Sequence, residues 1–101
     1  MIIDCHVHTN PAPQSVDELL NRLDIAGIDK MVLLSYHPAS FYRESPKEGD
    51  IFGKPVPPDK ALAQLMEWAA FSDRIIPFFW IDPLEEDSFE QVDRALAAGV
   101  A

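Results

Sequence analysis

A continuous apolar run, Met31-Val32-Leu33-Leu34-Ser35-Tyr36, constrains the fold of this chain more than any other feature. Strands with one face in water alternate apolar and polar residues, and this run hardly alternates. Strands buried on both faces have such sequences, and they belong to parallel sheets that are covered by helices. We therefore predict a strand over residues 31–36 within a parallel sheet.

Two further segments fit neighbouring strands of the same sheet. Residues 2–8 begin with two isoleucines, and residues 75–81 are apolar and aromatic. Pro77 lies inside the latter segment, and proline cannot donate to a sheet ladder, so we expect a strand start or a local bulge there. The predicted strands are residues 2–8, 31–36 and 75–81.

Helical patterns follow each predicted strand, and we place the helices at residues 16–26, 60–72 and 88–98. Ser15 and Glu18 form a capping box before the first helix, and Gly27 is suited to end it. Asp59 is the predicted cap of the second helix, and Asp87 or Ser88 that of the third. The predicted inner face of the third helix consists of Phe89, Val92, Leu96 and, as an additional candidate, Ala95, before Gly99 ends the helix.

The order strand–helix, repeated three times, is typical of the α/β class. Right-handed crossovers bring the carboxyl ends of all strands to one side of the sheet, where α/β enzymes place their sites. A closed (β/α)8 TIM barrel needs about 250 residues. We therefore predict that residues 1–101 are the N-terminal part of a single barrel domain, with the first three βα units of an apparently incomplete barrel.

His6 and His8 lie at the carboxyl end of the first predicted strand. Side chains two residues apart share a face of a strand, so these imidazoles should point the same way, together with Asp4, and Cys5 should face the other way. Neutral imidazole is the commonest metal ligand in proteins, so we predict that His6 and His8 bind a metal ion. Asp4 is expected to be structural or to support a ligand, and Cys5 to be buried. The alternative is two surface histidines that alternate by chance.

Residues 37–58 carry no periodic pattern and contain five prolines. A loop of this length is usually functional or mobile, and it leaves the same end of the sheet as the histidine pair. We consider a partial lid over the site and, with equal weight, a surface excursion. The candidate wall residues are Tyr36, His37, Phe41 and Tyr42. The candidate substrate-binding residues are Tyr36, His37 and Trp80, although for His37 we favour the alternative of a strand cap beside Pro38.

Charge and cysteine content exclude several classes of partner. The chain has 17 acidic and 8 basic residues, a net charge of −9, and no basic cluster, which argues against nucleic acid and anionic membranes. A single cysteine excludes an intrachain disulfide and fits a reducing compartment. With no signal peptide and no apolar run of membrane-spanning length, we expect a cytoplasmic protein. A small-molecule substrate is the expected partner, and a homo-oligomer is compatible with the sequence.

Several segments resemble the amidohydrolase superfamily, in particular the amidohydrolase-related branch that includes aminocarboxymuconate semialdehyde decarboxylase and lactone hydrolases. The resemblance is carried by Ile3–His8, Ser15–Leu20, Ala26–Leu33, Ile81–Pro83 and Ala97–Val100, and it spans nearly the whole chain. It implies a metal-dependent (β/α)8 barrel in which His6 and His8 are metal ligands. The expected cofactor is a divalent ion, with zinc first among the candidates. The family's other ligands come from its fifth, sixth and eighth strands, which residues 1–101 do not include.

The resemblance implies hydrolysis of an amide, lactone or ester, or decarboxylation of a carboxylated substrate. In such enzymes a divalent ion lowers the pKa of bound water to about 7 and polarises a substrate oxygen. With two of its ligands alone, the 101-residue chain is expected to be inactive by itself.

Two other interpretations remain open. The polymerase and histidinol phosphatase family, whose members are metal-dependent phosphoesterases, shares the first-strand histidine pair. That family usually has an Asp-His pair after its second strand, where this chain has Tyr36-His37. The other interpretation is a non-catalytic chain that associates with another subunit through the open edge of its sheet.

Overall fold

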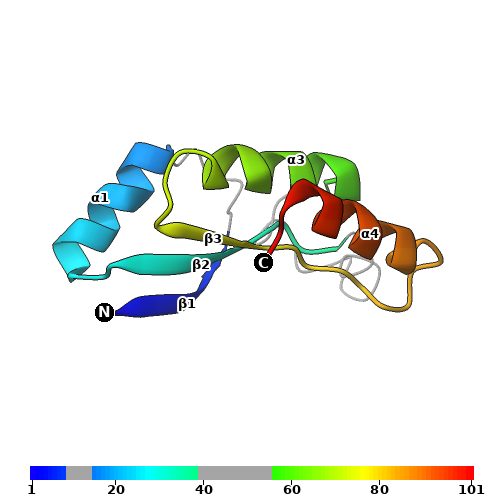
Figure 1. The fold of residues 1–101 in the computed structure, drawn as a ribbon, viewed down its shortest axis with the longest axis horizontal. Helices are drawn as coiled ribbons and strands as arrows, with labels where there is room; N and C mark the ends of the chain where they lie inside the picture. Colours follow the sequence, from blue (N-terminus) through cyan, green and yellow to red (C-terminus); the bar gives the residue numbers. More distant parts are fainter. Residues whose placement is uncertain (9–14, 39–55) are drawn as a thin grey trace, which may run out of the picture.

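The computed structural model describes residues 1–8, 15–38 and 56–101. Within these ranges the elements are β1 (Ile3–His8), α1 (Val16–Ala26), β2 (Lys30–Leu34), α3 (Pro58–Ala69), β3 (Ile75–Phe78) and α4 (Ser88–Ala98). The strands form one parallel sheet in the order β1-β2-β3. Figure 1 shows the three described helices on the same side of this sheet. The predicted α/β class is therefore confirmed as a small mixed α/β domain with a three-strand parallel sheet.

The core lies between the sheet and these helices. Met31 and Leu33 of β2 are completely buried, and they face a cluster formed by Val16, Leu19, Leu23, Leu65 and Ile75. The other residues of β2 are only half-buried, so the prediction of equal burial on both faces is wrong for the described part of the chain. The reason is that no described helix lies on the second face of the sheet (Figure 1).

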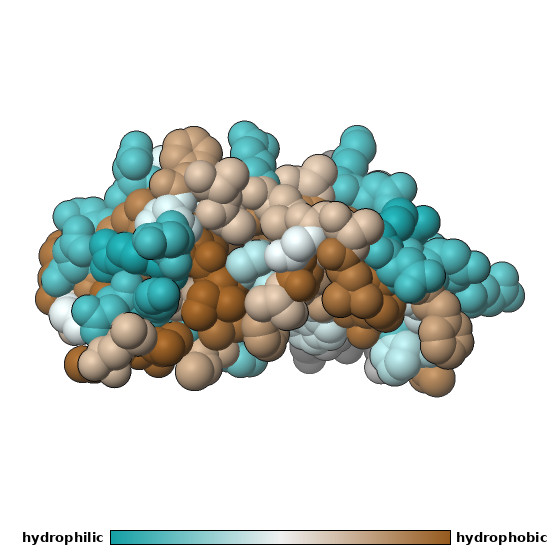
Figure 2. Space-filling view, viewed as in Figure 1, coloured by the Kyte–Doolittle hydropathy of each residue, from teal (hydrophilic) through white to brown (hydrophobic). Residues whose placement is uncertain are grey.

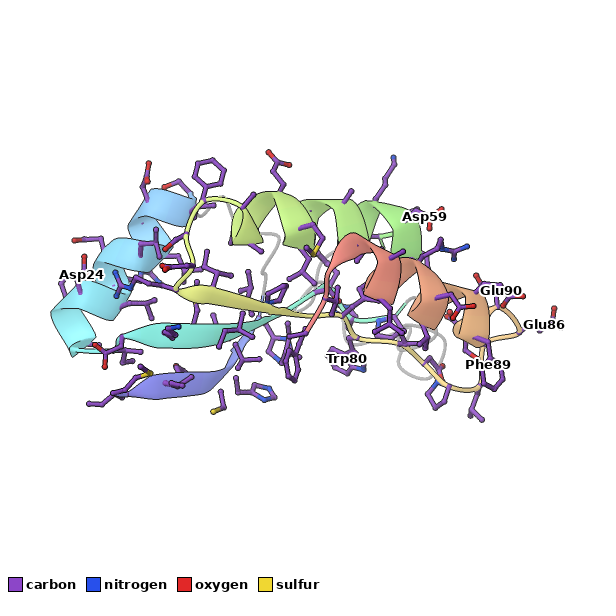
Figure 3. All side chains as sticks on the ribbon, viewed as in Figure 1. Asp24, Asp59, Trp80, Glu86, Phe89 and Glu90 are labelled. Carbon is purple, nitrogen blue, oxygen red and sulfur yellow. The ribbon has the colours of Figure 1, made fainter. Side chains whose placement is uncertain are left out.

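Helix α4 corrects another prediction. Phe89, Val92 and Leu96 were expected to face inward, yet their exposed fractions are 83%, 41% and 66%. The buried residues of α4 are Ser88, Gln91 and Ala95, so only Ala95 of the predicted face is buried. Phe89 points away from the rest of the domain in Figure 3. In Figure 2, hydrophobic patches lie among the hydrophilic surface over α4. The apolar stripe lies where no described element packs against the helix.

The helix ends agree in part with the sequence prediction. Ser15 Oγ accepts a hydrogen bond from the Glu18 amide at 3.1 Å, but the Glu18 carboxylate binds Arg22 instead of returning to Ser15. Gly27 and Gly99 end α1 and α4 with φ of 70° and 94°, a left-handed conformation that glycine adopts without strain.

The predicted caps of the other two helices need correction. Pro57 occupies the N-cap position of α3 and Pro58 begins the helix, a position where the missing amide hydrogen costs nothing. Asp59 therefore lies inside the first turn, where its carboxylate pairs with Arg94 at 3.2 Å. Asp87 does occupy the N-cap position of α4, but its side chain accepts from Gln91 and not from the helix backbone.

Pro77 lies within β3, neither at its start nor at a bulge. The strand accepts it there because the amide hydrogen that proline lacks would point to the outer edge of the sheet, away from β2. The carbonyl oxygens of Arg74 and Phe78 accept bonds from the Met31 and Ser35 amides of the β2 segment. The carbonyl of Pro77 points the other way and accepts from the Ala101 amide at 3.1 Å. A proline at this outward position removes no bond from the β2–β3 ladder, which explains why it is tolerated.

Arg74 braces the amino ends of the strands. Its guanidinium and Nε donate to the carbonyl oxygens of Ile28 and Asp29 and to the carboxylate of Asp24, all at 2.7–2.8 Å. The amide of Ile2 donates to the Asp29 carboxylate in the same region. The turns that precede all three strands are thus tied together. No helix in the described ranges has the length and continuous hydrophobicity that crossing a lipid bilayer requires.

Candidate metal-binding site at the carboxyl edge of the sheet

A β-bulge in β1 places the histidine pair. The register pairs Asp4 with Met31 and Val7 with Leu33, so two residues of β1, Cys5 and His6, lie opposite Val32 alone. The Asp4 carboxylate accepts a hydrogen bond from the His6 amide at 3.0 Å and thereby fixes the bulge. Because of the bulge, and contrary to our prediction, Asp4 does not lie in regular alternation on one strand face with His6 and His8. Its hydrogen bond with the His6 amide gives it a structural role.

His6 and His8 meet at the end of this strand. Their Nε2 atoms are 2.8 Å apart, and the rings form an edge-to-face pair with centroids 4.6 Å apart. At this distance one Nε2 carries a proton that it donates to the lone pair of the other Nε2. The prediction that both imidazoles point the same way is confirmed. Cys5, in contrast, is exposed on the edge strand, so the expectation that it is buried is wrong.

The surroundings lower the pKa values of His8 and His37. Burial lowers the pKa of His8 below 6.5, and the nearby His6 lowers it further. Burial and the charge of a protonated His8 likewise lower the pKa of His37. A neutral imidazole has a free lone pair for a metal ion, whereas a protonated one has none. The environment therefore favours the protonation state in which histidine acts as a ligand.

Aromatic side chains from the other two strands border the pair. The Trp80 ring, just beyond β3, lies 5.6 Å from the His8 ring and 6.3 Å from the His37 ring, as measured between centroids. Tyr36 is buried beside His37, with ring centroids 6.4 Å apart, and burial raises the pKa of its hydroxyl, which stays protonated at neutral pH. The structure thus brings all three sequence-predicted substrate-binding residues to the carboxyl edge of the sheet.

A small cavity opens at the same edge. Its lining includes Tyr36, His37, Phe79, Trp80 and Gln91. Gln91 comes from α4, is almost completely buried, and donates to the carboxylates of Glu85 and Asp87 at 2.8 Å. The predicted lid residues Phe41 and Tyr42 lie outside the described residues.

The donor chemistry of the pair suits a divalent ion such as zinc. Two nitrogens bound to one tetrahedral zinc, each at about 2.0–2.1 Å, are about 3.3 Å apart, so the pair at 2.8 Å would open slightly to receive an ion. Within the described ranges, no group of three or more His, Cys, Asp or Glu side chains is arranged to hold a metal. The pair therefore fits two positions of a coordination shell and leaves the others to further ligands.

Sequence reasoning missed two residues that shape this edge. Ser35 was included only as part of the apolar strand, yet it is completely buried and its hydroxyl binds the backbone of Trp80. A lone hydroxyl inside an apolar run is a signal, because a buried polar group needs a partner. Gln91 was not singled out, because most residues next to it and one turn away on the helix are polar and the sequence pattern gives no signal of its burial.

No protein-family model, curated protein or solved structure matches this chain.

Proposed function

We propose that this chain belongs to a metal-dependent hydrolase or decarboxylase of the amidohydrolase type, in which His6 and His8 hold a divalent ion, with zinc as the first candidate. The observation that carries the proposal is the convergence of two imidazoles, Nε2 to Nε2 at 2.8 Å, at the carboxyl edge of a parallel sheet. This is the edge where α/β enzymes place their sites.

Three features support a (β/α)8 barrel as the complete fold. The described helices lie on one face of the sheet, and no helix of the described residues covers the other face, as in a barrel wall (Figure 1). The Ala101 amide donates to the Pro77 carbonyl on the outer edge of β3, as the first bond of a further parallel strand would. The exposed stripe of α4, Phe89, Val92 and Leu96, lies where an additional βα unit would pack.

The residues of this chain would have separate tasks in such a site. His6 and His8 would hold the ion, and Tyr36, His37 and Trp80 would line the substrate pocket. The ion supplies Lewis acidity and lowers the pKa of water to about 7. The Tyr36 hydroxyl, protonated at neutral pH, can donate a hydrogen bond to a carbonyl or carboxylate of the substrate. Amides, lactones, esters and carboxylated compounds all present such an oxygen.

The decisive experiment compares zinc binding by the wild type and the double variant His6→Ala/His8→Ala. We expect the double variant to lose at least about 100-fold in affinity in a calorimetric titration, because both ligand nitrogens are gone. Cys5→Ser is the matched control, since it removes the only thiol of the strand and leaves both rings in place. Equal affinity in the double variant and the wild type would overturn the proposal.

Activity is tested separately on the complete zinc-loaded barrel of which we propose this chain to be the N-terminal part, because two ligands alone are not expected to support turnover. We expect turnover within a panel of lactones, amides, esters and carboxylated aromatics, and loss of that turnover in the double variant. Turnover of phosphate monoesters alone would instead support the phosphoesterase interpretation.

A further inference from the structure

The candidate site contains a contact that links strands β2 and β3 beyond their last paired residues. Leu34 and Phe78 are the last register pair, and the Ser35 amide donates to the Phe78 carbonyl at 3.0 Å. The Ser35 hydroxyl then accepts from the Trp80 amide at 2.9 Å and donates to the Tyr36 carbonyl at 3.1 Å. Because Ser35 is completely buried, water cannot replace these bonds.

The hydrogen bond to Ser35 fixes the backbone of Trp80, from which the indole side chain extends. Trp80 has only two side-chain torsions, so a fixed backbone leaves its ring few orientations. The ring lies against His8 at 5.6 Å and 43°, and against His37 at 6.3 Å and 62°, within the range in which aromatic rings attract one another. Figure 3 places Trp80 below the strand ends, and the ring distances to His8 and His37 make it a wall beside the histidine pair.

The wall has a consequence for the metal ligands. His8 belongs to an edge strand, is exposed, and has His6 and Trp80 as its described ring neighbours. Without the indole, the imidazole of His8 could rotate away from His6, and ordering the two rings at metal binding would then cost side-chain entropy.

We infer that Ser35 and Trp80 are positioning residues of the histidine pair: the buried Ser35 hydroxyl fastens the Trp80 backbone, and the Trp80 ring holds His8 in the orientation that directs its Nε2 at His6. The inference deepens the proposed function, since it assigns to this chain the preorganisation of a metal site.

The first test needs no metal. In wild-type protein we expect nuclear Overhauser contacts between the rings of Trp80 and His8, and different tautomers of His6 and His8 in long-range proton–nitrogen spectra. Ser35→Ala should lose the ring contacts, and Trp80→Ala should average the two tautomer patterns, whereas Trp80→Phe should keep them distinct. Ser72→Ala is the matched control, because Ser72 Oγ accepts from the Arg74 amide at 3.2 Å in the same way at the opposite end of the sheet. Retention of the ring contacts in Ser35→Ala together with distinct tautomers in Trp80→Ala would overturn the inference.

The second test measures zinc affinity of the same variants. We expect a loss of about 10-fold in Trp80→Ala and Ser35→Ala, a value near the wild type in Trp80→Phe, and no change in Ser72→Ala. Zinc binding that is equal in all four variants would show that the wall does not act on the ligands. If the wild type itself binds no zinc, the proposed function fails, and the metal-free spectra still decide whether Ser35 and Trp80 position the pair.

Discussion

The two ends of the sheet use their polar groups in opposite ways. At the amino end, Arg74 directs its side-chain donors to the Ile28 and Asp29 carbonyls and to the Asp24 carboxylate. At the carboxyl end, His6 and His8 direct their ring nitrogens at each other. Asp24 and Trp80 mark these separate regions in Figure 3.

The polar groups at the amino end of the sheet stabilise the fold, whereas those at the carboxyl end are suited to bind a ligand. A guanidinium that donates to backbone carbonyls pairs acceptors that the turns would otherwise leave without a donor. Its role is therefore to stabilise the fold. Two imidazoles in contact gain little from each other, and the lone pair of an imidazole nitrogen suits a metal ion better than another ring. We therefore expect amino-end substitutions to change stability and carboxyl-end substitutions to change binding.

The largest effect on stability is expected at Arg74. Arg74→Ala should lower the free energy of unfolding by about 2 kcal/mol, because the Ile28 and Asp29 carbonyls lose a charged donor. Arg74→Lys should recover only part of this loss, since an ammonium group cannot reproduce the planar fork. Chemical denaturation measures both.

The matched control for Arg74 is Arg22→Ala. Arg22 pairs with Glu18 on the exposed surface of α1, and its loss should cost no more than about 0.5 kcal/mol. Zinc affinity should be unchanged in all three arginine variants. A drop in zinc affinity for Arg74→Ala at full folding would contradict the division between the two ends.

A smaller effect is expected at Asp4, where the two roles meet. Asp4→Ala removes the acceptor of the His6 amide at the bulge and should cost about 1 kcal/mol of unfolding free energy. It should also weaken zinc binding, because the bulge directs His6 toward His8. Asp4→Asn keeps the side-chain oxygen and should retain most of both quantities. Thermal unfolding and calorimetric titration provide the two readouts, and normal zinc affinity in a folded Asp4→Ala variant would count against the bulge as an aid to the site.

The smallest effect is expected from pH. Because the native pKa values of His8 and His37 are lowered below 6.5, the unfolded chain binds more protons than the native one as pH falls through that value. The contribution of these two groups to stability should be complete above about pH 7 and should be lost as the pH falls below 6.5 toward their lowered native pKa values. Denaturation at a series of pH values measures this slope. It should flatten in His8→Asn/His37→Asn, and an unchanged slope would mean that other groups cause it.

The sequence predicted the elements better than their environment. The apolar period of α1, its Ser15 cap and Gly27 are local features, so the helix follows from neighbouring residues. Asp59 failed as a cap because Pro57 and Pro58 start α3 earlier. The face of α4 could not be deduced from its period, since burial depends on which elements lie opposite, and none of those described covers Phe89.

The candidate site was predictable in part for the same reason. The alternation of a strand is a local property, so His6 and His8 could be expected to converge. The bulge at Asp4 and the contact between Ser35 and Trp80 depend on register and on residues 45 positions apart, which local patterns do not encode. A bulge adds one residue to one strand and leaves no reliable periodic trace.

Pro77 has a consequence for self-association. On the outer edge of β3 it presents an acceptor with no amide donor beside it, and the chain's own Ala101 amide already uses that acceptor. A foreign strand aligned along this edge would leave its own carbonyl opposite Pro77 without a partner, at a cost of about 1–3 kcal/mol. A residue that at first seems misplaced in a strand thus acts against edge-to-edge aggregation.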